Sequence, residues 1–119
     1  MRRIVIGILP QEKMRARTIA IARGEYRPKR GEPQVWFPSM KSLAETLSDR
    51  NLELLKMIAE QKPESIAALS KKTGRAPSNL SRTLHRLAAF GFVKLEHLKG
   101  NVVRPVAQAT EYTIKAAAA

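Results

Sequence analysis

Apolar positions recur at helical spacing in the middle of the chain. The first such stripe consists of Leu52, Leu55, Ile58 and Ala59. It predicts a helix that starts at Asp49 as its N-cap and ends at the Lys62–Pro63 step, because the residue before a proline disfavours the helical conformation. A second, shorter helix is expected between Ser65, a good N-cap, and Gly74. The pattern therefore predicts two successive helices separated by a break.

A third stripe lies in the stretch "RAPSNLSRTLHRLAAFGFVKLE", which runs from Arg75 to Glu96. Leu80, Leu84 and Leu87 form its apolar face. Pro77 suits the first turn of a helix, where its missing N–H is harmless, and Gly91 is expected to end the helix. The alternating stretches "FVKLEH" and "NVVRPV" then predict a hairpin with "LKG" as its turn. Three helices followed by a hairpin form the pattern of a winged helix-turn-helix, in which the third helix enters the major groove of DNA.

The segments around this unit have shorter periodic stretches. Residues 2–9 predict a strand, residues 11–25 a helix, residues 39–47 a helix capped by Ser39, and residues 110–115 a further strand. The segment 26–33, with two prolines, a glycine and several charges, is expected to be a loop. We therefore expect an α+β chain in two parts: residues 1–38 as a strand–helix extension with a basic linker, for dimerisation or partner binding, and residues 39–119 as the DNA-binding domain.

The charge of the chain indicates which kind of partner this fold binds. The 119 residues carry 22 Lys and Arg against 10 Asp and Glu, a formal net charge of +12. Residues 1–30 hold nine basic and two acidic side chains, and residues 63–99 hold seven and two. An excess of this size favours a polyanionic partner, above all a nucleic acid.

The polar side of the third helix holds the residues that we expect to contact double-stranded DNA. Arg75, Ser78, Asn79 and Arg82 are the candidates for reading bases, since arginine pairs with guanine and serine or asparagine can bond to base edges. The flanking candidates, expected to meet phosphate, are Ser81, His85 and Arg86. At the hairpin the candidates are Lys99, Asn101 and Arg104. The alternative is an ordinary solvated helix face and an ordinary polar turn.

The basic N-terminal region has three interpretations. Its side chains would contact DNA as an extra arm, bind an acidic protein partner, or simply solvate a helix surface. They are Arg15, Arg17, Arg23, Arg27, Lys29 and Arg30.

The strand at residues 2–9 is expected to be an isolated edge strand, which needs a partner that a two-fold dimer supplies. Trp36 and Phe37 point to opposite faces of a strand, so either one belongs to the core and the other to an interface, or both belong to the core.

Other classes of function find little support. The chain has two histidines, no cysteine, no paired carboxylates and no nucleotide-binding or hydrolase motif, so neither an enzyme nor a metal or cofactor site is expected. No apolar run reaches the ~20 residues that span a bilayer, and the apolar stretch after Met1 lacks a cleavage site of small residues. The lack of cysteine is compatible with the reducing cytoplasm.

The stretch from Asp49 to Glu96 resembles the MarR-like winged helix-turn-helix regulators. With "ARGEYRP" and "VWFPSMKSLAETLSDRNLELL" included, the chain resembles the TumA-type antitoxins encoded beside small toxin genes. The resemblance implies a homodimer that binds an inverted-repeat operator, neutralises a cognate toxin and represses its own operon. By the same analogy, the candidates for the dimer contacts are the elements outside the winged helix: the strand at residues 2–9, the helix at residues 11–25 and the strand at residues 110–115. Three alternatives stay open: a stand-alone regulator that responds to a small ligand, a module that mainly masks a toxin, and an RNA-binding winged helix.

Overall fold

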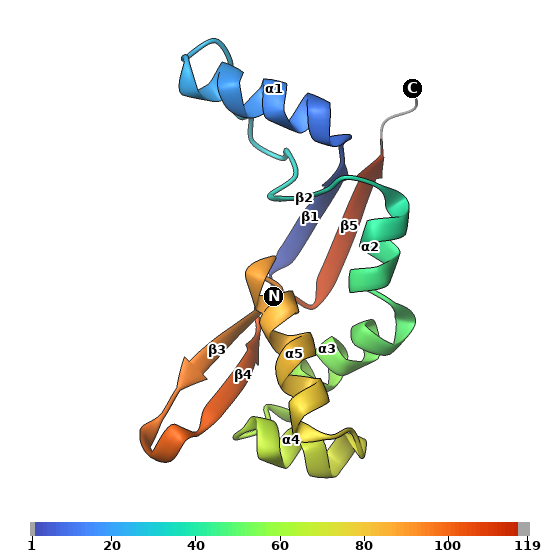
Figure 1. Cartoon of the computed structure of the whole chain (residues 1–119), viewed down its shortest axis with the longest axis vertical. Coiled ribbons are helices and arrows are strands. Elements are labelled where there is room, and N and C mark those ends of the chain that lie inside the picture. Colours follow the sequence, from blue (N-terminus) through green and yellow to red (C-terminus); the bar gives the residue numbers. More distant parts are fainter. Residues whose placement is uncertain (1, 117–119) are drawn as a thin grey trace.

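The computed structural model describes residues 2–116, which form a mixed α+β fold (Figure 1). The elements in chain order are β1 (Arg3–Ile8), α1 (Gln11–Ala22), β2 (Val35–Phe37), α2 (Met40–Thr46), α3 (Asp49–Gln61), α4 (Ile66–Thr73), α5 (Pro77–Ala89), β3 (Val93–His97), the 3-10 turn η1 (Lys99–Asn101), β4 (Val103–Ala107) and β5 (Glu111–Ala116). Every element expected from the sequence is present, with α1 ending three residues earlier than predicted. None of the helices in the described part of the chain combines the length and the apolar character needed to cross a membrane.

Serine side chains begin three of the helices. Ser39, Ser48 and Ser65 each accept a hydrogen bond from the backbone N–H three residues further on, at 3.0–3.2 Å. The predictions for Ser39 and Ser65 are confirmed. Asp49 is not the N-cap of α3 but its first helical residue, where its carboxylate still lies at the positive end of the helix. Each serine satisfies a backbone donor that the helix leaves free.

The apolar side of α3 is rotated relative to the prediction. Its buried residues are Leu54, Leu55 and Ile58, whereas Leu52 is 37% exposed. The helix ends at Lys62, which adopts a left-handed conformation before Pro63. The predicted end of this helix is therefore confirmed, but the expected stripe contained Leu52 in place of Leu54.

A tight turn connects α4 and α5. Gly74 ends α4 with φ +74°, a conformation that glycine adopts without strain. The Ser70 hydroxyl then donates to the Arg75 carbonyl at 2.6 Å, which fixes the direction in which the chain enters α5. Pro77 occupies the first turn of α5, and Gly91 with φ +85° follows its end, as predicted.

The strands form two separate sheets. β3 and β4 make the expected antiparallel hairpin. The other sheet has the order β2-β1-β5 and is parallel throughout, with Ile6 beside Val35 on one side and beside Ile114 on the other. The expectation that residues 2–9 form an isolated edge strand is therefore wrong, because β1 is the central strand. The sheet draws strands from both sides of the expected boundary at residue 38.

The hydrophobic core lies between one face of the parallel sheet and helices α2 to α5. Ile4 and Ile6 from β1 pack with the leucines of α5 and with Leu55 and Ile58 of α3. Phe37 and Phe92 are completely buried, and their rings stack at 6.4 Å with Phe90 beside them. Burial of each such side chain stabilises the fold by about 1.5–3 kcal/mol. This core fixes α5 against the rest of the molecule.

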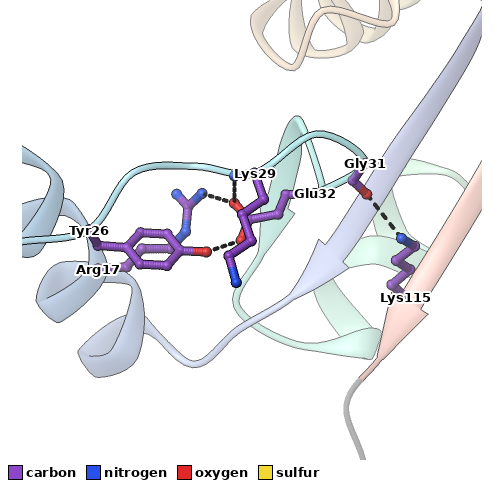
Figure 2. A network of polar contacts seen from close by, with 6 residues as sticks. All are labelled: Arg17, Tyr26, Lys29, Gly31, Glu32 and Lys115. Carbon is purple, nitrogen blue, oxygen red and sulfur yellow. Dashed lines mark hydrogen bonds and ion pairs between the residues drawn. The ribbon is translucent and has the colours of Figure 1, made fainter.

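Helix α1 projects from the sheet and buries no residue (Figure 1). Arg17 anchors the helix: its guanidinium lies over the Trp36 ring at 4.9 Å and donates to Glu32 at 3.1 Å. Glu32 also accepts hydrogen bonds from the Tyr26 hydroxyl and the Lys29 amide (Figure 2). Polar and cation–π contacts, rather than an apolar face, therefore hold α1 and its loop to the sheet.

Candidate nucleic-acid interface

Helix α5 separates apolar from polar side chains sharply. Leu80, Leu84 and Leu87 are fully buried. On the opposite side lies a set that we call the α5 polar surface: Arg75, Ser78, Asn79, Ser81, Arg82, His85 and Arg86. Ser78 and Arg82 lie at its centre, because a helix turns by 100° per residue and both positions are opposite the leucines. Six of the seven predicted residues of this region therefore lie on one side of α5, and Arg75, in the turn before the helix, reaches them through its side chain.

Arg75 lies along α5 and orients Asn79. Its Nε and Nη2 donate to Asn79 Oδ1 at 3.1 and 2.9 Å, and Nη2 also donates to Thr83 Oγ1 at 3.2 Å. Because the amide oxygen of Asn79 is engaged, its NH2 group points to solvent as a donor. Burial and, to a smaller extent, the nearby positive charge of Arg50 lower the pKa of the Arg75 guanidinium from its ordinary value.

His85 is held by the backbone of its own helix. Its Nδ1 lies 2.7 Å from the Ser81 carbonyl oxygen. A carbonyl can only accept, so Nδ1 carries the proton and Nε2 is the ring nitrogen available to a partner. The Ser81 hydroxyl lies 3.4 Å from the same Nδ1.

Three members of the α5 polar surface extend freely into solvent. Ser78, Arg82 and Arg86 are exposed, and none forms a side-chain hydrogen bond or ion pair with another of residues 2–116. A free guanidinium at the centre of a helix face can present two N–H groups to one acceptor pair, the geometry by which arginine reads guanine.

The hairpin contributes a basic tip. Lys99 and Asn101 are exposed in the turn η1, where Asn101 has φ +60°. Arg104 is placed differently from the tip residues: it pairs across the hairpin with Glu96, at 2.8 Å between Nη2 and Oε1. The structure therefore leaves Lys99 and Asn101 free at the tip and engages Arg104 within the hairpin. Figure 1 shows this tip and the α4–α5 turn at the same, lower end of the molecule.

A second basic group adjoins the α5 polar surface, and the sequence pattern did not indicate that its members lie together. Arg50 of α3 and Lys72 of α4 line a hollow together with Arg75. The three cations come from three elements, so only the packing of α3 against α4 and α5 brings them together. Glu53 also lines the hollow and partly offsets their charge.

The N-terminal basic residues lie elsewhere. Helix α1 and its loop are at the end of the molecule opposite α4 and the hairpin tip (Figure 1), and the longest dimension of the chain is 48 Å. Arg15, Arg23, Arg27, Lys29 and Arg30 are all exposed there, whereas Arg17 is engaged with Glu32 and Trp36. They do not join the α5 polar surface.

These features describe a mixed α+β protein in which a helix with a basic polar face is followed by a hairpin with a basic tip. The chain belongs to the HVO_A0114 family, whose family model matches residues 46–114. The match covers α3 to α5, the hairpin and most of β5, and so contains every residue of the candidate interface. Neither a curated protein nor a solved structure matches the chain.

Proposed function

We propose that this protein binds double-stranded DNA as a winged helix-turn-helix, with α5 in the major groove. The observation that carries the proposal is the α5 polar surface, where free Arg82 and Ser78 stand opposite three fully buried leucines. An α-helix fits the major groove, and its N-terminal residues reach base edges in this class of protein. Lys99 at the hairpin tip and the group formed by Arg50 and Lys72 are assigned to phosphate contacts.

The proposal extends to a transcriptional regulator of the MarR-like, TumA-type antitoxin group, acting in the cytoplasm without catalytic activity. Its support is the sequence resemblance together with a net charge of +12. Such a protein represses its own operon and neutralises a cognate toxin. The exposed basic side chains around α1 lie at the other end of the molecule from the tip of the hairpin. They are therefore free to bind an acidic toxin while α5 is bound in the major groove of DNA.

The proposal is tested by fluorescence anisotropy with the DNA immediately upstream of this gene and with scrambled DNA of equal length. Titrations across a series of salt concentrations separate the two terms of binding, because phosphate contacts weaken with salt whatever the sequence. We expect tight binding to the upstream DNA alone at physiological salt. Equal and steeply salt-sensitive binding to both would mean that net charge alone binds DNA, and would overturn sequence-specific recognition.

Arg82→Ala tests the assignment of base contact. We expect its specific affinity to fall by about 1–3 kcal/mol, with relaxed preference at one base pair and little change for scrambled DNA. Lys99→Ala is the matched comparison: it should weaken binding to all sequences alike and lower the salt slope by about one unit. If Arg82→Ala weakens both DNAs equally, Arg82 contacts phosphate and the base-reading role is wrong.

A further inference from the structure

The outer edge of β5 is open. β5 pairs with β1 on one side, and no strand among residues 2–116 pairs with its other side. Every strand of this type exposes a row of backbone N–H and C=O groups that can pair with another chain. The edge is six residues long, from Glu111 to Ala116, which is the length of an average strand.

The side chains of β5 are divided between the two faces of the sheet. Tyr112 and Ile114 lie on the core side, beside Ile4 and Ile6 of β1. Whereas Ile6 is completely buried, Ile114 is 49% exposed, since it lies at the edge. Tyr112 borders an apolar hollow that Leu52 and Leu55 also line. An exposed apolar strip therefore accompanies the open edge on this face.

The opposite face of β5 carries Glu111, Thr113 and Lys115. Glu111 forms no ion pair with another described residue, and the Lys115 ammonium donates one hydrogen bond to the Gly31 carbonyl at 2.9 Å (Figure 2). An ammonium has three donors, so two remain for a second acceptor. The strand thus carries an acid near its start and a base near its end, both on one face.

This arrangement is self-complementary in one antiparallel register. With Thr113 opposite Thr113 of a second copy, Glu111 faces Lys115 of that copy and Tyr112 faces its Ile114, each pair occurring twice. Shifting the register by two residues leaves at least one charge without its opposite, and shifting it by one places the apolar side chains opposite the charged ones. Directly opposed opposite charges and apolar pairs are the contacts that stabilise adjacent strands.

We propose that β5 is the dimer interface and that its partner is a second copy of this chain, paired antiparallel about Thr113. The two sheets then form one six-stranded sheet with β5 strands at its centre, and two-fold symmetry makes the contact closed. The inference builds on the proposed function, because it supplies the two-fold dimer that an inverted-repeat operator requires. Its tests use the protein without DNA, so a failure of DNA binding and a failure of this interface are distinguishable.

Single cysteines test the register directly, because the chain has no cysteine of its own. Thr113→Cys places two thiols opposite each other across the two-fold axis, within the Cα separation of about 4.5–5.5 Å that a disulfide spans. Glu111→Cys is the matched control: its two copies are separated by four residues along the strands, about 13 Å. Under mild oxidation we expect a disulfide-linked dimer from Thr113→Cys and none from Glu111→Cys. Equal cross-linking of both, or of neither, would overturn the register.

Reversal of the charges tests the pairing itself. In sedimentation velocity we expect a wild-type dimer at micromolar concentration and a dimerisation constant at least about tenfold weaker for Lys115→Glu, in which two glutamates face two others. The double variant Glu111→Lys/Lys115→Glu restores opposite charges and should dimerise like the wild type, although it lacks the Lys115 bond to Gly31. Lys71→Glu, on α4, is the control for net charge. A monomeric wild type, or a double variant as weak as Lys115→Glu with a native circular dichroism spectrum, would overturn the proposal.

Discussion

Gly7 is the residue of β1 against which Trp36 and Pro33 pack. A Cβ at this position would lie 2.5 Å from Cζ3 of Trp36 and 2.7 Å from Cγ of Pro33, distances that no packed side chain tolerates. The absence of a side chain therefore lets the Trp36 ring pack closely against β1 at Gly7, while the Arg17 guanidinium lies over the same ring. Glycine is required here for close approach rather than for its backbone conformation.

Gly7→Ala is expected to destabilise the protein by about 1–3 kcal/mol, because the indole ring must move away from the strand. Trp36 is the single tryptophan, so its emission should shift as the ring becomes more exposed. Chemical denaturation followed by fluorescence measures both effects. Arg3→Ala, an exposed change on the same face of β1, is the control. An unchanged midpoint and emission in Gly7→Ala would contradict the packing role of the glycine.

Tyr112 gives the fold a dependence on alkaline pH. Burial raises the pKa of its hydroxyl above the ordinary value of 10.0, and this hydroxyl has no hydrogen-bond partner among the described residues. A raised pKa in the folded state contributes stability that is fully present below pH 10.0 and is lost as the pH rises through the folded-state pKa.

Tyr112→Phe should therefore weaken the fall in unfolding free energy above pH 10.0. At neutral pH it should leave stability unchanged or raise it by up to about 1 kcal/mol, because it removes an unpaired buried hydroxyl. Urea titrations between about pH 8 and about pH 11, a range that includes the ordinary tyrosine pKa of about 10, provide the measurement. Tyr26→Phe is the comparison, since the pKa of Tyr26 is raised mainly by its hydrogen bond to Glu32. The role of Tyr112 is wrong if Tyr112→Phe keeps the wild-type pH profile.

The sequence predicts the ends and the polar faces of the helices better than the contacts between elements. The ends of α4 and α5 follow from Ser65, Gly74, Pro77 and Gly91, because caps and breakers act within a few residues. The α5 polar surface was predicted from the helical spacing of the leucines, which leaves the polar residues on the other side of the helix. The spacing of Arg75, Asn79 and Thr83 by four residues was the available signal for their hydrogen bonds. The engagement of Arg104 by Glu96 depends on the register of the hairpin, and the approach of Arg50 to Arg75 depends on packing between helices. Neither is encoded in local spacing.

Helix α1 is held to the rest of the molecule mainly by the contacts of Arg17, because it has no buried apolar face. Arg17→Ala removes the contacts to Glu32, Tyr26 and Trp36 together, and α1 has no buried residue to compensate. We expect amide hydrogen exchange in α1 to accelerate by about tenfold, while α5 keeps its protection. Arg15→Ala, an exposed change two residues away, should leave both helices unchanged. Equal exchange in the two variants would show that α1 is stabilised by other contacts.

The parallel sheet is the part of the whole molecule that the sequence pattern did not predict. Its strands were expected individually, but periodicity says nothing about which strands pair when they lie far apart along the chain. Residues 3–8 pair with residues 35–37 and 111–116, and this arrangement places β1 at the centre. The core depends on it, since Ile4 and Ile6 are buried against helices that follow much later in the sequence.

Deletion of residues 2–9 is therefore expected to disrupt the whole parallel sheet, because it removes the central strand. Without β1, strands β2 and β5 lose their shared partner, and the apolar side chains of Phe37 and Tyr112 lose their cover. We expect a loss of cooperative urea unfolding by circular dichroism. The double variant Arg2→Ala/Arg3→Ala, which keeps the strand, should unfold like the wild type. A deletion variant with an unchanged midpoint would show that the helices and the hairpin fold without the sheet.

The pairing of β1 with β5 also affects the order in which parts of the protein can fold during translation. Residues 3–8 of β1 pair with residues 111–116 of β5, so β1 leaves the ribosome well before its principal partner does. Helices α3 to α5 and the hairpin consist of local contacts and can form earlier, since short loops close quickly and long ones slowly. During translation the apolar segment β1 therefore remains without its β5 partner, and the edge that β5 later covers is open. Its two leading arginines, Arg2 and Arg3, keep that segment charged, and charge next to an apolar strand opposes aggregation until the sheet closes.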